Sequence, residues 1–332
     1  MNQQAQNQQG LGTRNRKALK IEWPTLALIL GCYGTWFLAG IYLWPFSAFL
    51  ALPVMAVCVA LQSSLVHEVL HGHPTRSAAI NEALVSLPIG LVWPYRRFKT
   101  LHLRHHADER LTDPFDDPES YYQALWKHAQ MPNWLKAILR INNTMLGRLA
   151  LGPWLSGIGL ILGDAKSIRS GDREIAVAWG LQIMGVVVVA LIVTRLFAMP
   201  LWMYGIFAVW PGLSAISIRT YAEHQWSEDP NGRTIIVEKS PLAALYLYNN
   251  LHFVHHARPT APWYHLPAMF RERRDDWVRE NNGYVFPNYR TMLRAYAFKA
   301  KEPVVHPALR LTPECGGAVA WRAQKMASKR DR

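Results

Sequence analysis

Four apolar stretches constrain the fold of this 332-residue chain more than any other feature. Each approaches the roughly 20 residues that an α-helix needs to cross the hydrocarbon layer of a membrane. Only a few residues connect the first stretch to the second and the third to the fourth, so each pair is expected to form a helical hairpin. The predicted spans are residues 24–44, 45–66, 175–194 and 197–218. We therefore expect an all-α integral membrane protein with four transmembrane helices in two hairpins.

The distribution of Lys and Arg favours one orientation in the membrane. Basic residues precede the first span, follow the second and follow the fourth. Because positively charged loops tend to remain in the cytoplasm, we expect a multi-pass protein of the inner, or cytoplasmic, membrane with both termini and the central loop in the cytoplasm. The formal net charge is +13, but the basic residues flank apolar stretches and do not form a basic stripe with surface aromatics. No nucleic-acid partner is therefore expected.

The segment between the hairpins, residues 67–174, is too long and too polar to be a simple connector and is expected to carry function. It contains two shorter apolar pieces, Ala83–Trp93 and Met145–Gly163, each interrupted by a proline. We interpret both as interfacial or re-entrant helices, although the second could be a further span. Residues 1–20 are expected to form a disordered basic tail, residues 21–300 the main domain, and residues 301–332 a basic C-terminal tail.

Eight of the 13 histidines fall into three short clusters, HEVLH, HLRHH and HFVHH. Spacings of three and four residues place the rings of each cluster on one face of a helix. Neutral imidazole nitrogens suit iron, zinc or copper, whereas calcium and magnesium prefer oxygen. Eight rings exceed the capacity of one metal ion, so two metal ions are expected. The clustered candidate ligands are His67, His71, His102, His105, His106, His252, His255 and His256.

The remaining histidines are weaker candidates, because a lone histidine is more often a hydrogen-bonded core residue than a ligand. His73 lies close to the first cluster in HGHP, where Gly72 and Pro74 indicate that the helix is ending, and it is left out of the ligand set. His128, His265 and His306 are also left out of the ligand set.

Carboxylates near the clusters could orient the rings, since metal-bound imidazoles usually donate their other N–H to a carboxylate or carbonyl. Glu68, Asp108 and Glu223 are candidates for this role, and solvated surface charges are an equally good interpretation. The acidic run LTDPFDDPES, with Asp113, Asp116 and Asp117, is expected to be a loop that caps the site or only a turn.

The three clusters resemble the histidine boxes of the membrane fatty acid desaturase and hydroxylase superfamily in order, spacing and position relative to the spans. The resemblance covers about Val66 to Pro267. It implies a cytoplasmic helical cap that holds a histidine-rich di-iron site, and a further ligand between the last hairpin and the third box, matched by His224 in TYAEHQW. The stretch HHARPTAPWYHLP also looks like the ending of bacterial members that include carotenoid ketolases and hydroxylases.

The resemblance implies an O2-dependent oxidase that uses two non-haem iron ions to attack an unactivated C–H bond of a lipid in the bilayer. A fatty acid or acyl-lipid desaturase is the leading interpretation, and a fatty-acyl or carotenoid hydroxylase or ketolase is the alternative, because the same ligands serve both outcomes. The chain lacks a Cys cluster, a GxGxxG fingerprint and an HPGG signature, so a separate ferredoxin- or cytochrome-like electron donor is expected.

Two other classes of protein fit parts of the pattern. HEVLH also matches HExxH, the zinc-peptidase helix in which Glu68 would be the general base, but a peptidase leaves both HxxHH clusters unexplained. A metal transporter would place ligands inside the spans along a path, and the predicted spans contain no His, Asp or Glu. The oxidase accounts for more of the sequence than either alternative.

Overall fold

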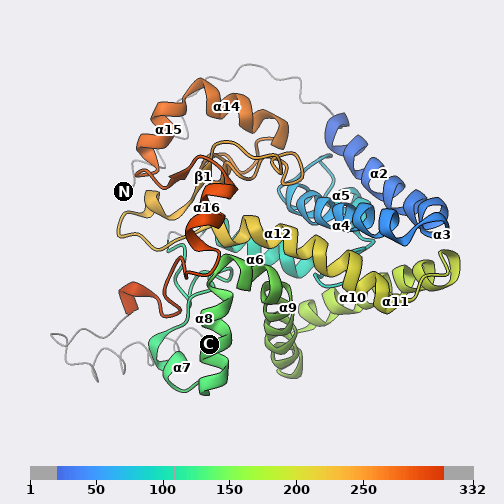
Figure 1. Cartoon of the computed structure of the whole chain (residues 1–332), viewed down its shortest axis with the longest axis horizontal. Helices are drawn as coiled ribbons and strands as arrows, with labels where there is room; N and C mark the ends of the chain where they lie inside the picture. Colours follow the sequence, from blue (N-terminus) through green and yellow to red (C-terminus); the bar gives the residue numbers. More distant parts are fainter. Residues whose placement is uncertain (1–20, 108–109, 310–332) are drawn as a thin grey trace.

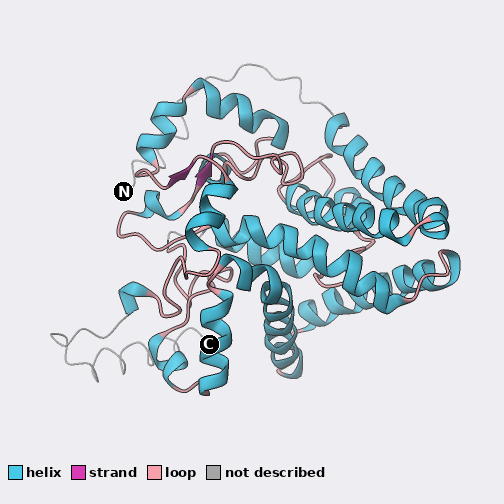
Figure 2. Ribbon diagram, viewed as in Figure 1, coloured by secondary structure: helices cyan, strands magenta, loops and turns pink. Residues whose placement is uncertain are grey.

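A computed structural model of the chain describes residues 21–107 and 110–309, and its regular structure is almost entirely helical (Figures 1 and 2). The structure is mostly helical, as the expectation of an all-α fold requires, apart from one short pair of strands. Residues 1–20, residues 310–332 and Asp108 lie outside the described residues, so the expectations for the N-terminal tail, most of the C-terminal tail and that carboxylate stay predictions.

Five helical runs are long and apolar enough to cross a membrane, judged by length and composition. Four of them overlap the predicted spans, and the fifth is the helix that begins at Met145. The runs are Trp23–Phe46 (α2 Trp23–Leu38, the π-helical turn η1 Ala39–Leu43, and α3 Trp44–Phe46), Ala48–Leu70 (α4), Met145–Arg169 (α9), Arg173–Leu196 (α10 Arg173–Leu191 and η2 Ile192–Leu196), and Leu201–Glu223 (α11 Leu201–Tyr204, η3 Gly205–Val209 and α12 Trp210–Glu223).

The helix α9 continues through Pro153, where the sequence suggested an interruption. A proline inside a helix has no N–H to donate to the carbonyl four residues earlier. That carbonyl belongs to Leu149, and the hydroxyl of Ser214 on α12 donates to it at 2.7 Å. The neighbouring helix therefore replaces the missing hydrogen bond, and α9 reaches a length that the pattern around Pro153 did not indicate.

The other apolar piece, Ala83–Trp93, is not a continuous helix. Helix α5 (Ala78–Val85) ends before Pro88, and the chain then runs without regular structure to Pro94. Its buried carbonyls accept hydrogen bonds from side chains of the long helices: Tyr33 donates to Leu87, Tyr204 to Ile89 and Gln182 to Leu91. Partners from other helices thus satisfy an irregular backbone that would otherwise be costly to bury. The prediction of a helix over the whole piece was wrong.

The long helices pack around one core that joins α2, α4, η2 and η3. The ring of Trp36 contacts the ring of Phe197 edge to face, with 5.2 Å between centroids, and its Nε1 donates to the hydroxyl of Tyr204 at 2.9 Å. Gly212 allows α12 to approach α4, since a Cβ there would lie 2.6 Å from the carbonyl oxygen of Ala56. The turns at α3 and α11 lie at the same end of the molecule (Figure 1).

Most of the remaining elements lie on the side of the molecule away from α3 and α11 (Figure 1). Strands β1 and β2 form a parallel pair with Ile236 opposite Val285. The bounds are α6 Tyr95–Ala107, α7 Leu125–Ala129, α8 Asn133–Asn142, η4 Pro230–Arg233, β1 Ile236–Val237, α13 His252–Ala257, η5 Trp263–His265, α14 Leu266–Glu272, α15 Arg274–Glu280, β2 Val285–Phe286, α16 Tyr289–Tyr296 and η6 Pro307–Leu309.

The first residues of the segment assigned to the C-terminal tail, 301–309, belong to the described structure. The backbone N–H of Gln123 donates to the carbonyl of Val304 at 2.8 Å, and the N–H of His306 donates back to Gln123 at 3.1 Å. The hydroxyl of Tyr122 donates to Glu302 at 2.7 Å. These bonds fix the segment against the loop that follows α6.

Candidate metal centre

The ends of two long helices and two short helices carry the predicted ligands. Helix α4 extends beyond the predicted span, so that His67 lies in its last turn and His71 caps its C-terminus. Helix α6 carries the second cluster and α13 the third. His224 follows directly after α12, in extended backbone with φ −129° and ψ 148°.

All nine predicted histidines come together in two groups, each of which could hold a metal ion. In each group one nitrogen of every ring lies within 4.8 Å of the others. We call the two groups site A and site B. Site A contains His67, His71, His102, His106 and His255, and site B contains His105, His224, His252 and His256.

The Nε2 atoms converge at distances typical of neighbouring ligands on one metal ion. In site A the Nε2 atom of His106 lies 3.0 Å from that of His102 and 3.1 Å from that of His255. In site B the Nε2 atom of His224 lies 3.1 Å from that of His105 and 3.0 Å from that of His252. Two nitrogens bound at about 2.1 Å and at right angles would be about 3.0 Å apart. The spacing fits metal coordination.

Three of the rings have their Nδ1 atoms held by oxygen acceptors. His102 lies 2.8 Å from Glu119, His105 lies 2.7 Å from Asp117, and His252 lies 3.0 Å from the amide oxygen of Asn249. An Nδ1–H that donates to these oxygens leaves the Nε2 lone pair free to face the group centre. Nε2 lone pairs that point at one another repel unless a cation lies between them. The tautomers with the proton on Nδ1 therefore also fit a metal ion.

The charge state of most rings suits metal binding, because only a neutral imidazole offers a lone pair. Burial, reinforced by a neighbouring histidine, lowers the pKa of His71 and that of His224 to about 3. The same two causes hold the pKa values of His252, His255 and His256 well below the ordinary range. These rings are uncharged at neutral pH.

His105 differs from the other rings. Burial alone would lower its pKa, but the carboxylates of Glu119 and Asp117 outweigh burial and raise the pKa of His105 to about 9. A metal ion at Nε2 would replace the second proton of this ring, while Asp117 keeps the hydrogen bond at Nδ1. A site that binds a proton so readily at this position also favours a metal cation there.

The acceptors that contact the rings most closely were not predicted as such. Asp117 and Glu119 belong to the acidic run, which was expected to cap the site or to be only a turn, and Asn249 was not considered. Of the proposed acceptors, Glu223 lies 3.6 Å from Nδ1 of His252 and 2.8 Å from Arg219. Spacing could not reveal Asp117 and Glu119, because a Pro-containing loop brings them back over α6.

His73 lies outside both sites, as the sequence analysis expected. Its Nδ1 atom is 2.7 Å from Glu22, and its Nε2 atom is 3.6 Å from Glu68. The two carboxylates lie on opposite nitrogens of the ring, an arrangement that suits an ion-pair network more than a common metal ion. Glu68 also accepts the backbone N–H of Trp263 at 3.0 Å, which ties the segment after the third cluster to α4.

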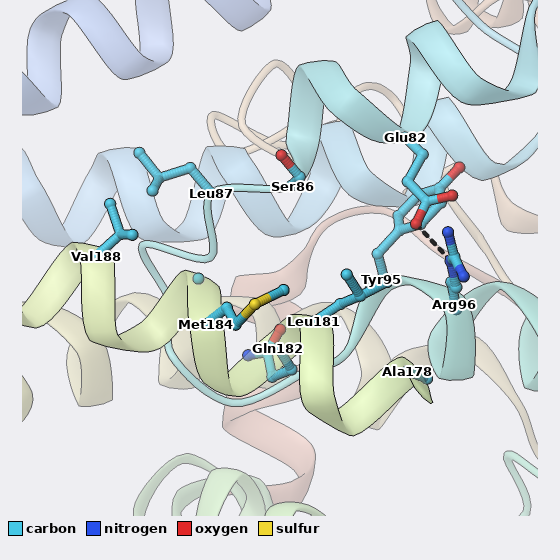
Figure 3. Close-up of a pocket in the computed structure, with 11 residues that line it drawn as sticks. Glu82, Ser86, Leu87, Tyr95, Arg96, Ala178, Leu181, Gln182, Met184 and Val188 are labelled. Atoms are coloured by element: carbon cyan, nitrogen blue, oxygen red, sulfur yellow. Dashed lines mark hydrogen bonds and ion pairs between the residues drawn. The ribbon is translucent and has the colours of Figure 1, made fainter. Parts of the chain in front are cut away.

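A groove with a volume of about 310 Å³ runs along α10 and is separate from the nine histidines (Figure 3). One end is polar, with Arg96 bound to Glu82 at 2.6 Å. The other end is apolar and carries Leu87 and Val188, with Leu181 and Met184 of α10 between the two ends. Because none of the nine histidines lines the groove, its walls alone offer no site for oxidation chemistry.

The family described as Fatty acid desaturase matches residues 42–288, which include all nine histidines. A search of curated proteins gave no match.

Proposed function

The chain belongs to the fatty acid desaturase family, and on this premise we propose that it is a fatty acid or acyl-lipid desaturase of the cytoplasmic membrane with two iron ions at sites A and B. Membership of the family makes the chain a membrane oxidoreductase of the desaturase type. The observation that carries the finer proposal is the convergence of nine histidines into two adjoining groups at the ends of membrane-length helices.

The donor set favours iron over a structural zinc ion. Zinc in structural sites takes four ligands in a tetrahedron, whereas site A offers five imidazoles. The Nε2 atom of His67 is buried and has no hydrogen-bond partner among the described residues, so it is available as a ligand. Bound iron would supply, with O2, the oxidising power to remove hydrogen from an unactivated C–H bond.

The protein itself would orient the rings and exclude water. Glu119, Asp117 and Asn249 fix Nδ1–H donors and so aim Nε2 inward. His67, His105 and His255 are buried, which keeps bulk solvent from the reacting centre. Desaturation removes two hydrogens from adjacent carbons. With two electrons and two protons from a donor, one O2 then becomes two water molecules.

The alternative within the same class is a fatty-acyl or carotenoid hydroxylase or ketolase. Insertion of one oxygen into the same C–H bond would use the same nine ligands. The match to the family described as Fatty acid desaturase is what favours an acyl substrate.

We also propose that only four of the five membrane-length helices cross the bilayer. Sites A and B adjoin, and the Nε2 atoms of His105 and His224 are 3.1 Å apart, so both residues lie on the same side of the membrane. An even number of crossings must therefore separate them, but α9, α10 and the run that ends in α12 lie between them in the sequence. One of these three cannot span.

The helix α9 is the best candidate for the one that does not cross. Its mean hydropathy is the lowest of the five. Its buried Asp164 binds Arg97 of α6 at 2.8 Å, and α6 is the helix that carries the second cluster. In Figure 1, α9 also runs across the direction of α12. We infer that α9 lies along the cytoplasmic surface and that the four remaining helices form two hairpins beneath a cytoplasmic cap.

The electron donor is proposed to be a separate acidic protein of the ferredoxin or cytochrome type. Arg104 and Arg258 are exposed close to ligands of both sites, and cationic side chains there would steer an acidic partner. The zinc-peptidase alternative has less support, because Glu68 faces His73 and the backbone of Trp263 and the chain belongs to an oxidoreductase family.

Lipid analysis tests the reaction. The chain would be expressed in a host whose lipids lack the product, and total lipids would be compared by mass spectrometry. Loss of two hydrogens supports the desaturase, gain of one oxygen supports the hydroxylase, and gain of one oxygen with loss of two hydrogens supports the ketolase. The variants His105→Ala and His255→Ala should abolish the change, whereas His265→Ala, at an exposed ring outside both sites, should retain it.

Cysteine labelling tests the topology. In a background without native cysteines, Ser170→Cys at the end of α9 should react with a membrane-impermeant maleimide from the cytoplasmic side, and so should Lys127→Cys. Arg195→Cys, at the turn of the second hairpin, should react only from the other side. Labelling of Ser170→Cys together with Arg195→Cys from the outer side would show that α9 crosses the membrane.

A further inference from the structure

His224 is anchored differently from the other rings of site B. It follows the end of α12 in extended backbone and forms an isolated β-bridge with Thr234. His105 and His252 have their Nδ1 atoms held by Asp117 and Asn249. The Nδ1 atom of His224 is buried and has no hydrogen-bond partner among the described residues. The direction of its ring must therefore depend on its backbone.

Two side chains hold that backbone at the carbonyl oxygen of His224. The ammonium group of Lys301 donates to it at 2.6 Å, and the hydroxyl of Tyr121 donates to it at 2.5 Å. The same ammonium group also contacts the hydroxyl of Tyr284 at 2.7 Å and the carbonyl of Ala222 at 3.4 Å. All three donors of Lys301 are thus directed at the end of α12 or at a tyrosine that contacts it.

The position of Lys301 has a physical basis in the helix end. The last carbonyls of a helix lack partners within the helix and carry partial negative charge, so a cation there is favourable. In α12 the carbonyl of Ala222 accepts from Tyr284 at 2.7 Å, and the carbonyl of Glu223 accepts from the N–H of Ile235 at 3.0 Å. Lys301 adds N–H donors at this helix end and extends the contact one residue further, to the carbonyl of His224, while burial lowers the pKa of its amine to about 7.

Lys301 lies in the segment that follows α16 and is itself held in place by Asn143, at the end of α8. Its backbone N–H donates to the carbonyl of Asn143 at 3.2 Å, and the amide of Asn143 donates to the carbonyl of Glu302 at 3.0 Å. Tyr121 is held by the guanidinium of Arg148, which lies 5.0 Å from its ring centroid. Both donors to His224 therefore approach from anchored parts of the structure.

We propose that Lys301 is a positioning residue of the metal centre, which acts with Tyr121 through the carbonyl of His224 to aim the His224 ring into site B. The inference rests on the proposed function, because it assigns a role in metal binding. Loss of the ammonium group should loosen one of the four rings of site B and leave the five rings of site A in place. Changes in groups that orient metal ligands typically weaken metal affinity by about tenfold to a hundredfold.

The test uses the purified full-length protein and compares iron content among matched variants. Lys301→Met removes the charge and keeps the length of the side chain, and Tyr121→Phe removes only the hydroxyl. Lys299→Met is the control, because Lys299 is exposed on the same segment. His224→Ala gives the reference for complete loss of the ring. The measurements are metal per chain by elemental analysis, the rate of iron release to a chelator, and thermal unfolding.

We expect Lys301→Met to lose iron from one site and retain it at the other, with chelator release from the weakened site about tenfold to a hundredfold faster. Tyr121→Phe should show a smaller effect in the same direction, and Lys299→Met should match wild type. Excess Fe²⁺ should restore the missing iron in Lys301→Met, and Lys301→Arg should retain part of it because it keeps a cation and N–H donors.

Two results would overturn the inference while leaving the proposed function intact. One is that Lys301→Met keeps both iron ions and releases them at the wild-type rate. The other is that it loses both together with thermal stability, which would make Lys301 a general structural residue. The proposed function is tested by the metal content of the wild-type protein alone. If the wild-type protein contains zinc in place of iron, the iron assignment is overturned, and the variants are then compared by their zinc content. If the wild-type protein contains no metal, both proposals are overturned.

Discussion

Asp117 Oδ1 lies 2.7 Å from Nδ1 of His105, and both side chains are buried. Replacing Asp117 with Asn keeps the size of the side chain and removes the charge that stabilises the Nδ1–H. We expect Asp117→Asn to weaken iron binding at site B by about tenfold to a hundredfold, measured by titration of the metal-free protein. Asp116→Asn is the control, because Asp116 binds Arg110 at the surface. Equal affinities in the two variants would contradict the prediction.

A hydrogen-bonded pair inside the helical core gives a prediction about stability. The hydroxyl of Tyr204 accepts from Trp36 and donates to the carbonyl of Ile89. Tyr204→Phe would leave both of those groups buried without a partner, at a cost of about 1–3 kcal/mol for each unsatisfied group. The free energy of unfolding in detergent should fall accordingly. Tyr42→Phe, at a residue 68% exposed, should have no measurable effect, and a similar loss in both variants would refute the role of the pair.

The close approach of α4 and α12 should fail when a methyl group is added at Gly212. A Cβ there would lie 2.6 Å from the carbonyl oxygen of Ala56 and 2.8 Å from Val59. Gly212→Ala should therefore destabilise the protein by about 1–3 kcal/mol. It should also reduce activity, because α4 carries His67 and α12 leads to His224. Gly205→Ala has open space around it and should be harmless. Wild-type melting temperature and activity in Gly212→Ala would exclude this packing.

The stability of the metal-free protein should decrease in acid. In the folded state burial, with a neighbouring histidine, lowers the pKa of His71 and of His224 from 6.5 to about 3. Below pH 6.5 the unfolded chain therefore binds protons that the folded chain rejects, and stability falls as pH falls from 6.5 towards 3. His105 acts in the opposite direction: its raised pKa stabilises the folded state fully below pH 6.5, and this contribution is lost as pH rises from 6.5 through about 9.

Thermal unfolding of the metal-free protein at a series of pH values between 7.5 and 5 checks the acid effect. The variant His224→Ala, which lacks one of the buried rings, should lose less stability over the same interval than the unmodified chain. A melting temperature that does not change with pH would contradict the lowered pKa values.

The sequence was informative where function depends on regular spacing. Residues three and four apart share a helix face wherever the helix lies, so the rings of HLRHH and HFVHH could be grouped before any tertiary structure was known. His224 stands alone in TYAEHQW, and only the family resemblance pointed to it. The structure brings it within 3.1 Å of both His105 and His252.

The sequence was least informative where one segment supplies a partner to another. The hydroxyl of Ser214 makes Pro153 tolerable inside α9, and no local pattern around Pro153 indicates a donor 61 residues away. The same applies to Lys301, which lay in a segment interpreted as a tail but contacts the carbonyl of His224. Hydropathy also cannot separate a helix that crosses the bilayer from one that lies on it, because both can be long and apolar.

The composition of the two sites has a consequence for how the protein is made. Site A needs His255 and site B needs His256, and both residues lie about three quarters of the way along the chain. Neither site can be complete while the first hairpin is being inserted, and a nascent chain that ends before α13 has no full set of ligands. Metal loading must therefore follow synthesis and insertion of nearly the whole protein. On the proposed function, a cell short of iron would accumulate an inserted precursor that later iron could activate without new translation.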